Sequence, residues 1–169
     1  MNAQTILTFY LLLTASMLAG WYYGTLTLPE QTRQHVIEER EKIRALPALR
    51  ICTLIFYNNF YVMLPMFIPV IGVIYAIHVA FNTGIIFSAI IPSNTYLLLF
   101  LLTHPVPLLE LTAYSIALSI GWKVMRKLST KDEDITLTTF LNYFVASVAV
   151  LLLAAVVETY VIVYSICLL

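Results

Sequence analysis

The longest uncharged stretch of the chain runs from residue 51 to residue 109 and reads ICTLIFYNNFYVMLPMFIPVIGVIYAIHVAFNTGIIFSAIIPSNTYLLLFLLTHPVPLL. A helix needs about 20 mostly apolar residues to cross the roughly 30 Å hydrocarbon core of a bilayer. The stretch is too long for two simple spans, and its prolines mark places where helices end or bend. It predicts several membrane helices in succession.

The composition of the whole chain agrees with a membrane environment. Of its 169 residues, 61% are hydrophobic and 11% are charged, and the mean hydropathy is +0.91. These values exclude an ordinary soluble domain. Nine basic residues balance nine acidic ones, so no net positive charge would attract nucleic acid. We expect the lipid bilayer as a partner and no nucleic acid.

The charged residues gather in two segments. One segment covers residues 29–50 and the other residues 123–134, and the only charges outside them are Glu110 and Glu158. The sequence therefore predicts an all-α, polytopic transmembrane helical bundle in a single domain. Four predicted spans cover residues 6–28, 51–68, 70–91 and 142–166. The first span has no Lys or Arg before it, so we expect it to be retained rather than cleaved as a signal peptide.

Residues 94–122 do not fit a simple span. Only about ten apolar residues precede Pro105 and Pro107, and about fifteen follow them, so each run is too short to cross as a helix. This pattern predicts a broken helix or a re-entrant pair of half-helices.

The positions of the basic residues lead to a predicted orientation. All nine Lys and Arg lie in the two charged segments, so the positive-inside rule makes both connectors cytoplasmic. An even number of crossings must then separate them. Two spans and a re-entrant segment over 94–122 satisfy this condition, as would four short crossings. We expect a multi-pass protein of the cell membrane with its N- and C-termini outside.

Small residues recur at helical spacing in two of the predicted segments and favour close helix packing. The predicted helix-packing residues are Ser16, Gly20, Gly24, Ala113, Ala117 and Gly121. The same pattern predicts that Glu110, at the head of the second stripe, faces protein rather than lipid. A homo-oligomer or a complex with other membrane proteins is the partnership that we expect.

Polar groups inside predicted spans are candidate binding residues, because an acidic side chain at membrane depth costs several kcal/mol unless it is paired or protonated. The candidate substrate- or ion-binding residues are Glu110, His104, Asn58, Asn59, Asn82 and Glu158. The alternative is structural. Glu110 would cap a helix turn, and Glu158 would be hydrated near the outer surface. Asn82 and His78, which share a helical face, would form interhelical hydrogen bonds. The three histidines lack metal-site spacing, and we assign no catalytic residue, metal or cofactor.

The two connectors carry their own predictions. Residues 29–47 are expected to form a short helix between two prolines, acting as a solvated connector or docking to a cytoplasmic partner. In the second connector one helical face carries the predicted lipid-headgroup residues Lys123, Arg126, Lys127 and Lys131. The alternative role for this face is to set the topology.

Four short motifs recur in an order that resembles the stage II sporulation protein M family. They are Tyr57-Asn58-Asn59, Asn82-Thr83-Gly84, the segment 103–110 that leads into an Ala/Gly-rich helix, and Ala154-Ala155-Val156-Val157-Glu158. The resemblance covers about residues 55–165. Two motifs depart from the family pattern, since Thr83 interrupts an Asn-Gly pair and His-Pro-Val-Pro replaces Pro-His-Gly.

The resemblance implies a multi-span membrane protein that acts as a scaffold in a membrane-remodelling complex of spore-forming bacteria, with transport suggested for other members. Three functions follow from the residues and the resemblance together. The first is a non-enzymatic component of a membrane complex, and the second is a small permease or channel-like protein that uses the broken segment and Glu110. The third is an intramembrane enzyme with Glu110, Glu158 and His104 as acid and base groups.

Overall fold

The protein is an all-α helical bundle in a computed structural model that describes residues 3–91, 104–130 and 135–164. Its helices are α1 (Ala3–Thr27), α2 (Glu30–Arg44), α3 (Ala48–Met63), the short 3-10 helix η1 (Leu64–Phe67), α4 (Ile71–Ile90), α6 (Pro105–Thr130) and α7 (Leu137–Tyr164). No strand occurs among the described residues. Four helices, α1, α4, α6 and α7, are long and apolar enough to cross a membrane, which confirms the predicted helical membrane protein.

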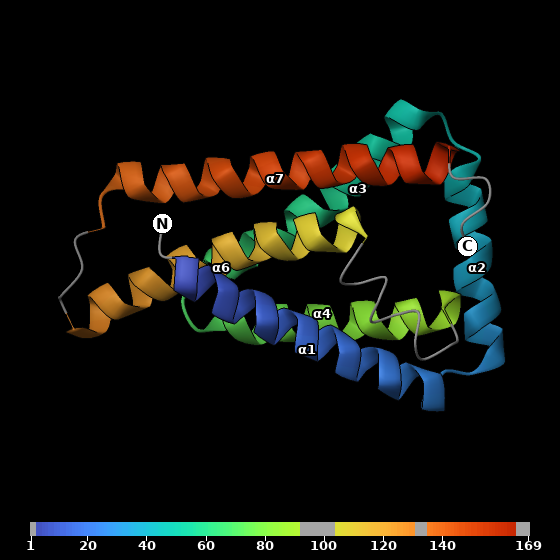
Figure 1. Ribbon diagram of the computed structural model, residues 1–169, viewed down its shortest axis with the longest axis horizontal. Helices are drawn as coiled ribbons and strands as arrows, with labels where there is room; N and C mark the ends of the chain where they lie inside the picture. The colour runs from blue at the N-terminus through green and yellow to red at the C-terminus, as the bar shows by residue number, and fades with distance from the viewer. Residues whose placement is uncertain (1–2, 92–103, 131–134, 165–169) are drawn as a thin grey trace.

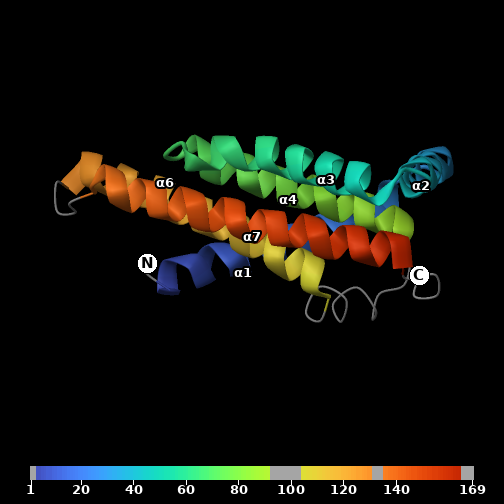
Figure 2. The same cartoon turned by 90° about the horizontal axis from the view of Figure 1, so that it is seen from above.

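Helices α1, α3, α4, α6 and α7 lie lengthwise along the bundle, and α2 lies across one end of it (Figures 1 and 2). Prolines set both boundaries of this crossing helix, because Pro29 directly precedes α2 and Pro47 directly precedes α3. A proline has no N–H to donate, and its fixed φ suits the start of a helix. The ends of α1, α4 and α7 and the starts of α3 and α6 face the end covered by α2 (Figure 1).

The predicted span 51–68 is shorter than expected. α3 has 16 residues and ends at Met63, where the Pro65-containing 3-10 turn of η1 begins. Sixteen residues extend about 24 Å, which is less than the roughly 30 Å of a bilayer core. The chain then reverses through Val70, a β-branched residue with a φ of 64°, and α4 starts at Ile71, one residue from the predicted boundary.

Small residues bring α1 and α4 into close parallel contact. Gly20 and Gly24 lie against the α4 backbone, and Gly84 of α4 lies against Met17 of α1. The Ser16 hydroxyl donates a hydrogen bond of 2.9 Å to the Ile77 carbonyl, so this small polar residue also lies at the contact. Close approach of this kind is how membrane helices gain packing contacts where lipid supplies no hydrophobic driving force between them.

Helix α6 is the most buried of the candidate spans. Ala113 and Ala117 are fully buried, and Gly121 lies against the backbone of η1. Ser115 and Ser119 are also buried, and each donates its hydroxyl to the carbonyl four residues earlier. The stripe of small residues therefore lies in the centre of the bundle, where neighbouring helices surround it.

The described part of the segment 94–122 belongs to a longer helix than the sequence-based half-helix, while the broken or re-entrant arrangement itself stays a prediction. α6 continues without a break from Pro105 to Thr130, and Pro105–Ser129 is itself a candidate span. The two prolines occupy its first turn, where the missing N–H has no helical acceptor, so they begin the helix rather than interrupt it. Residues 94–103 lie outside the described residues.

The direction of α6 bears on the predicted topology. It runs from the α2 end of the bundle to the opposite end, so residues 29–50 and 123–130 lie at opposite ends (Figure 1). The first helix begins at one end of the bundle and α7 finishes at the other (Figure 1). The parity argument assumed a segment that returns, whereas α6 runs from one end of the bundle toward the other. The sides of the membrane on which the connectors and the termini lie stay predictions.

Candidate functional site

Arg33 holds α2 against the bundle. Its guanidinium donates to the carbonyls of Ser88 at 2.7 Å, Gly24 at 3.1 Å and Thr25 at 3.3 Å, and its Nε donates to Leu28 at 3.3 Å. These carbonyls belong to the last turns of α1 and α4 and to the residue after α1, where helical acceptors have no partner within the helix. A cation is favourable there because helix C-termini carry negative partial charge. One side chain thus joins three helices.

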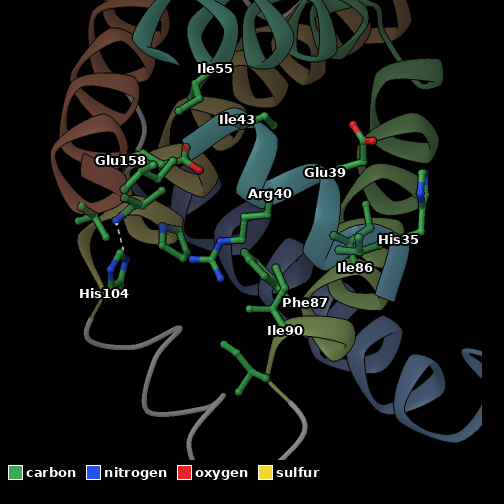
Figure 3. A pocket seen from close by; sticks show the side chains of 16 residues that line it. His35, Glu39, Arg40, Ile43, Ile55, Ile86, Phe87, Ile90, His104 and Glu158 are labelled. Carbon is green, nitrogen blue, oxygen red and sulfur yellow. Dashed lines mark hydrogen bonds between the residues drawn. The ribbon is translucent and has the colours of Figure 1, made fainter. Parts of the chain in front are cut away.

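A cavity of about 410 Å³ lies between α2 and the ends of four bundle helices (Figure 3). Its walls are mainly aliphatic and come from α2, α3, the end of α4, the start of α6 and the last turns of α7. The apolar lining residues are Val36, Ile43, Ile55, Ile86, Phe87, Ile90, Ile91, Val106, Pro107, Val161 and Ile162. Its size and composition are those of a small-molecule site, in which a few polar groups interrupt an apolar surface.

Five titratable side chains complete the lining. His104 and Glu158 were predicted as site residues, whereas His35, Glu39 and Arg40 come from the connector helix α2. Figure 3 shows Arg40 between Glu158 and His104 on one side and Glu39 and His35 on the other. His104 accepts a hydrogen bond of 3.4 Å from the backbone N–H of Val106, at the start of α6. The cavity therefore carries charges of both signs.

Glu110 lies close to this cavity but does not line it. The Asn59 side chain of α3 donates a short hydrogen bond to the Glu110 carboxylate of α6, joining two helices that are far apart in the sequence. The Glu110 and Glu158 carboxylates are near enough to interact electrostatically. Three of the predicted polar residues, Asn59, Glu110 and Glu158, thus belong to one neighbourhood.

Two other candidates lie elsewhere. Asn58 is exposed, and its side-chain amide donates a long hydrogen bond of 3.4 Å to the side-chain oxygen of Asn59. Asn82 pairs with His78 on α4, with 2.8 Å between Asn82 Nδ2 and His78 Nε2. Gly84, Ala80 and Ala76 face the core from the same helix, so the His78–Asn82 pair lies on the opposite, outward face of α4 and does not line the cavity.

The predicted headgroup residues are at the far end of α6. Lys123 places its Nζ 5.4 Å from the centre of the Tyr143 ring, and Lys127 donates to the Ile135 carbonyl at 3.2 Å. Arg126 is exposed, and Lys131 lies outside the described residues. Both lysines therefore contact α7 or the residues that lead into it.

The contribution of α2 was missed because the connector helix was interpreted as solvated or as docking to a cytoplasmic partner. A signal was present: Val36, Arg40 and Ile43 are spaced by four and three residues, so they share a helical face. All three line the cavity. Within the described ranges, no group of three His, Cys, Asp or Glu side chains is arranged to hold a metal ion.

Comparison with known proteins identifies the family. The model of the family described as stage II sporulation protein M matches residues 8–161, nearly the full chain. No curated protein matches the chain significantly, and no solved structure does. The motifs described above, including the Asn59 and Glu110 positions that meet between α3 and α6, fall within the matched residues. The chain therefore belongs to the stage II sporulation protein M family.

Proposed function

We propose that the protein is a non-enzymatic component of a membrane complex and contacts its partner through the outward face of α4. The observation that carries this proposal is the His78–Asn82 pair. The pair lies near the middle of a 20-residue candidate span, and His78 is exposed. Its helical neighbours on the exposed surface are the isoleucines Ile71, Ile74 and Ile86.

A polar pair at this depth is unfavourable against lipid. The hydrogen bond between the two side chains uses one polar atom of each, which leaves a second ring nitrogen on His78 and the amide oxygen on Asn82. Polar side chains in membrane spans face other protein or water, because hydrocarbon offers no hydrogen bonds. A further membrane helix, from a second copy or another protein, would supply hydrogen-bond partners for these two atoms.

The oligomeric state in mild detergent tests this proposal. We expect the wild-type protein to be an assembly by sedimentation and by native mass spectrometry. The double variant His78→Leu/Asn82→Leu should shift the protein toward the monomer. Each interhelical hydrogen bond contributes on the order of 0.5–2 kcal/mol, so the shift corresponds to a several-fold weaker association. Ile74→Leu on the same face is the matched control and should change nothing. A wild-type protein that is a lone monomer by native mass and that brings down no membrane protein would refute the proposal.

A small permease or channel-like role is the second candidate. The cavity with Glu158, His104 and Arg40, together with the nearby Asn59–Glu110 contact, favours it. Intramembrane carboxylates next to a cavity are common in solute and ion pathways. Flux into liposomes measures this activity. Flux that is absent, or that Glu110→Gln leaves unchanged, would rule against this role.

A further inference from the structure

The cavity beneath α2 contains two opposite charges that do not contact each other. Within the described part of the chain, the Arg40 guanidinium and the Glu158 carboxylate make no hydrogen bond and no ion pair within 4 Å. Burial disfavours the charged form of the Glu158 carboxylate, and the Arg40 guanidinium is the nearby charge that partly offsets this cost. Both side chains are partly buried. Each of the two side chains lies in the cavity without a direct partner. This arrangement is costly unless a ligand or water binds the charged group.

The surroundings of these charges are those of a membrane boundary. α2 lies across the end of the bundle, and its face toward solvent is strongly charged. Glu158 is six residues before the last described residue of α7, which corresponds to about 9 Å along the helix. The cavity therefore lies where the charged helix α2 meets the apolar ends of the bundle helices, and its aliphatic walls lie beside the two charges.

We infer that this cavity binds a zwitterionic phospholipid, with the phosphate at Arg40, the ammonium group at Glu158 and one apolar chain along the aliphatic walls. A purely anionic head would meet Glu158, and a purely cationic head would meet Arg40. A head with both charges satisfies both side chains. The planar guanidinium of Arg40 suits a phosphate, since it offers several N–H donors in one plane. The volume, about 410 Å³, fits part of one lipid rather than a whole molecule.

Lipid binding to the purified, delipidated protein tests the inference, with native mass spectrometry as the readout. We expect phosphatidylethanolamine to bind more tightly than phosphatidylglycerol, and Arg40→Gln to weaken that binding about tenfold, the loss typical of one charge-assisted hydrogen bond. Glu158→Gln should remove the preference for the zwitterionic head. Arg44→Gln is the matched control, because Arg44 is on the same helix, is exposed and pairs with Glu41 at 3.6 Å. It should bind as the wild type does.

Three outcomes would overturn the inference. Equal affinity of the wild type and Arg40→Gln for phosphatidylethanolamine would show that the lipid does not bind at Arg40. A preference for phosphatidylglycerol would exclude a zwitterionic head. Binding of free phosphoethanolamine as tight as that of the lipid would make the ligand a soluble zwitterion rather than an amphiphile. Arg40 is on α2, outside the bundle core, so its variant remains informative if Glu158→Gln does not fold.

Discussion

Asn59 of α3 donates its side-chain amide to the Glu110 carboxylate of α6, and this contact joins two residues 51 positions apart. Removing one partner leaves the other unsatisfied in an apolar environment, which costs more than the bond itself contributes. We therefore expect Asn59→Leu and Glu110→Leu each to lower the midpoint of thermal unfolding in detergent. Glu110→Gln should be milder, since its amide oxygen still accepts the Asn59 hydrogen bond.

A double-mutant cycle isolates this contact. The coupling free energy between Asn59→Leu and Glu110→Leu should be about 0.5–2 kcal/mol, as for other interhelical hydrogen bonds in membranes. Asn58→Leu, at the exposed neighbouring position, is the control and should add independently to Glu110→Leu. Strict additivity of Asn59→Leu and Glu110→Leu would contradict the contact.

The close packing of α1 on α4 should be sensitive to a single methyl group. A Cβ at Gly20 would collide with the Phe81 carbonyl oxygen, and a Cβ at Gly84 with that of Met17. Backbone cannot move aside as a side chain can, so Gly20→Ala and Gly84→Ala should each destabilise the fold by about 1–3 kcal/mol.

Gly121 offers a graded comparison for this effect. A Cβ there would meet the Met66 carbonyl oxygen at 3.1 Å, a tight contact that small adjustments relieve. Unfolding by denaturant in mixed micelles should rank Gly121→Ala as the least harmful of the three variants. The reverse order would mean that α1 and α4 are not in close contact.

Arg33 should control the attachment of α2. Arg33→Gln loses a charged group that donates to four carbonyls, each such bond contributing about 1.5–3 kcal/mol at most. We expect faster amide hydrogen exchange across residues 30–44 and little change in α6. Arg44→Gln is the matched control on the same helix. Unchanged exchange in Arg33→Gln would show that α2 is held by other contacts.

The topology of the bundle can be read by labelling from the two sides of the membrane. Position 34 is exposed on α2, and position 128 is exposed near the end of α6. With Cys52 and Cys167 replaced by serine, single cysteines at these positions should react with an impermeant reagent from opposite sides. Reaction of both from the same side would restore the arrangement with two cytoplasmic connectors.

The exposed Glu39–Lys42 pair on α2 gives a pH-dependent signal. Lys42 lowers the pKa of Glu39 below its ordinary value of 4.5, first through a hydrogen bond of 2.6 Å and then through its charge. The favourable interaction is therefore present above pH 4.5 and is lost as the pH falls through the lowered pKa. The pKa of Glu39, followed by NMR, should rise in Lys42→Ala. It should also rise in high salt, because salt screens exposed ion pairs. Lys127→Ala, at the other end of the bundle, should leave it unchanged.

Parts of the candidate site were predictable from sequence. Glu110 and Glu158 stood out as the only charges beyond the two connectors, and His104 stood out beside its prolines. Their partners were not predictable, because Asn59 reaches Glu110, and Arg40 faces Glu158, only through the packing of distant helices. Arg40 in particular is one charge among many in a connector, and nothing local distinguishes it from Arg44.

The sequence by itself determined that the protein is a helical membrane protein and where α2 begins. Composition and proline act locally, within a span or a single turn, so they can be read along the chain. Tertiary structure alone decided that α6 crosses the bundle, and that the connectors lie at opposite ends. Near the end of α6, Lys123 lies over the Tyr143 ring and Lys127 donates to the Ile135 carbonyl. Such contacts depend on neighbours that hydropathy does not identify.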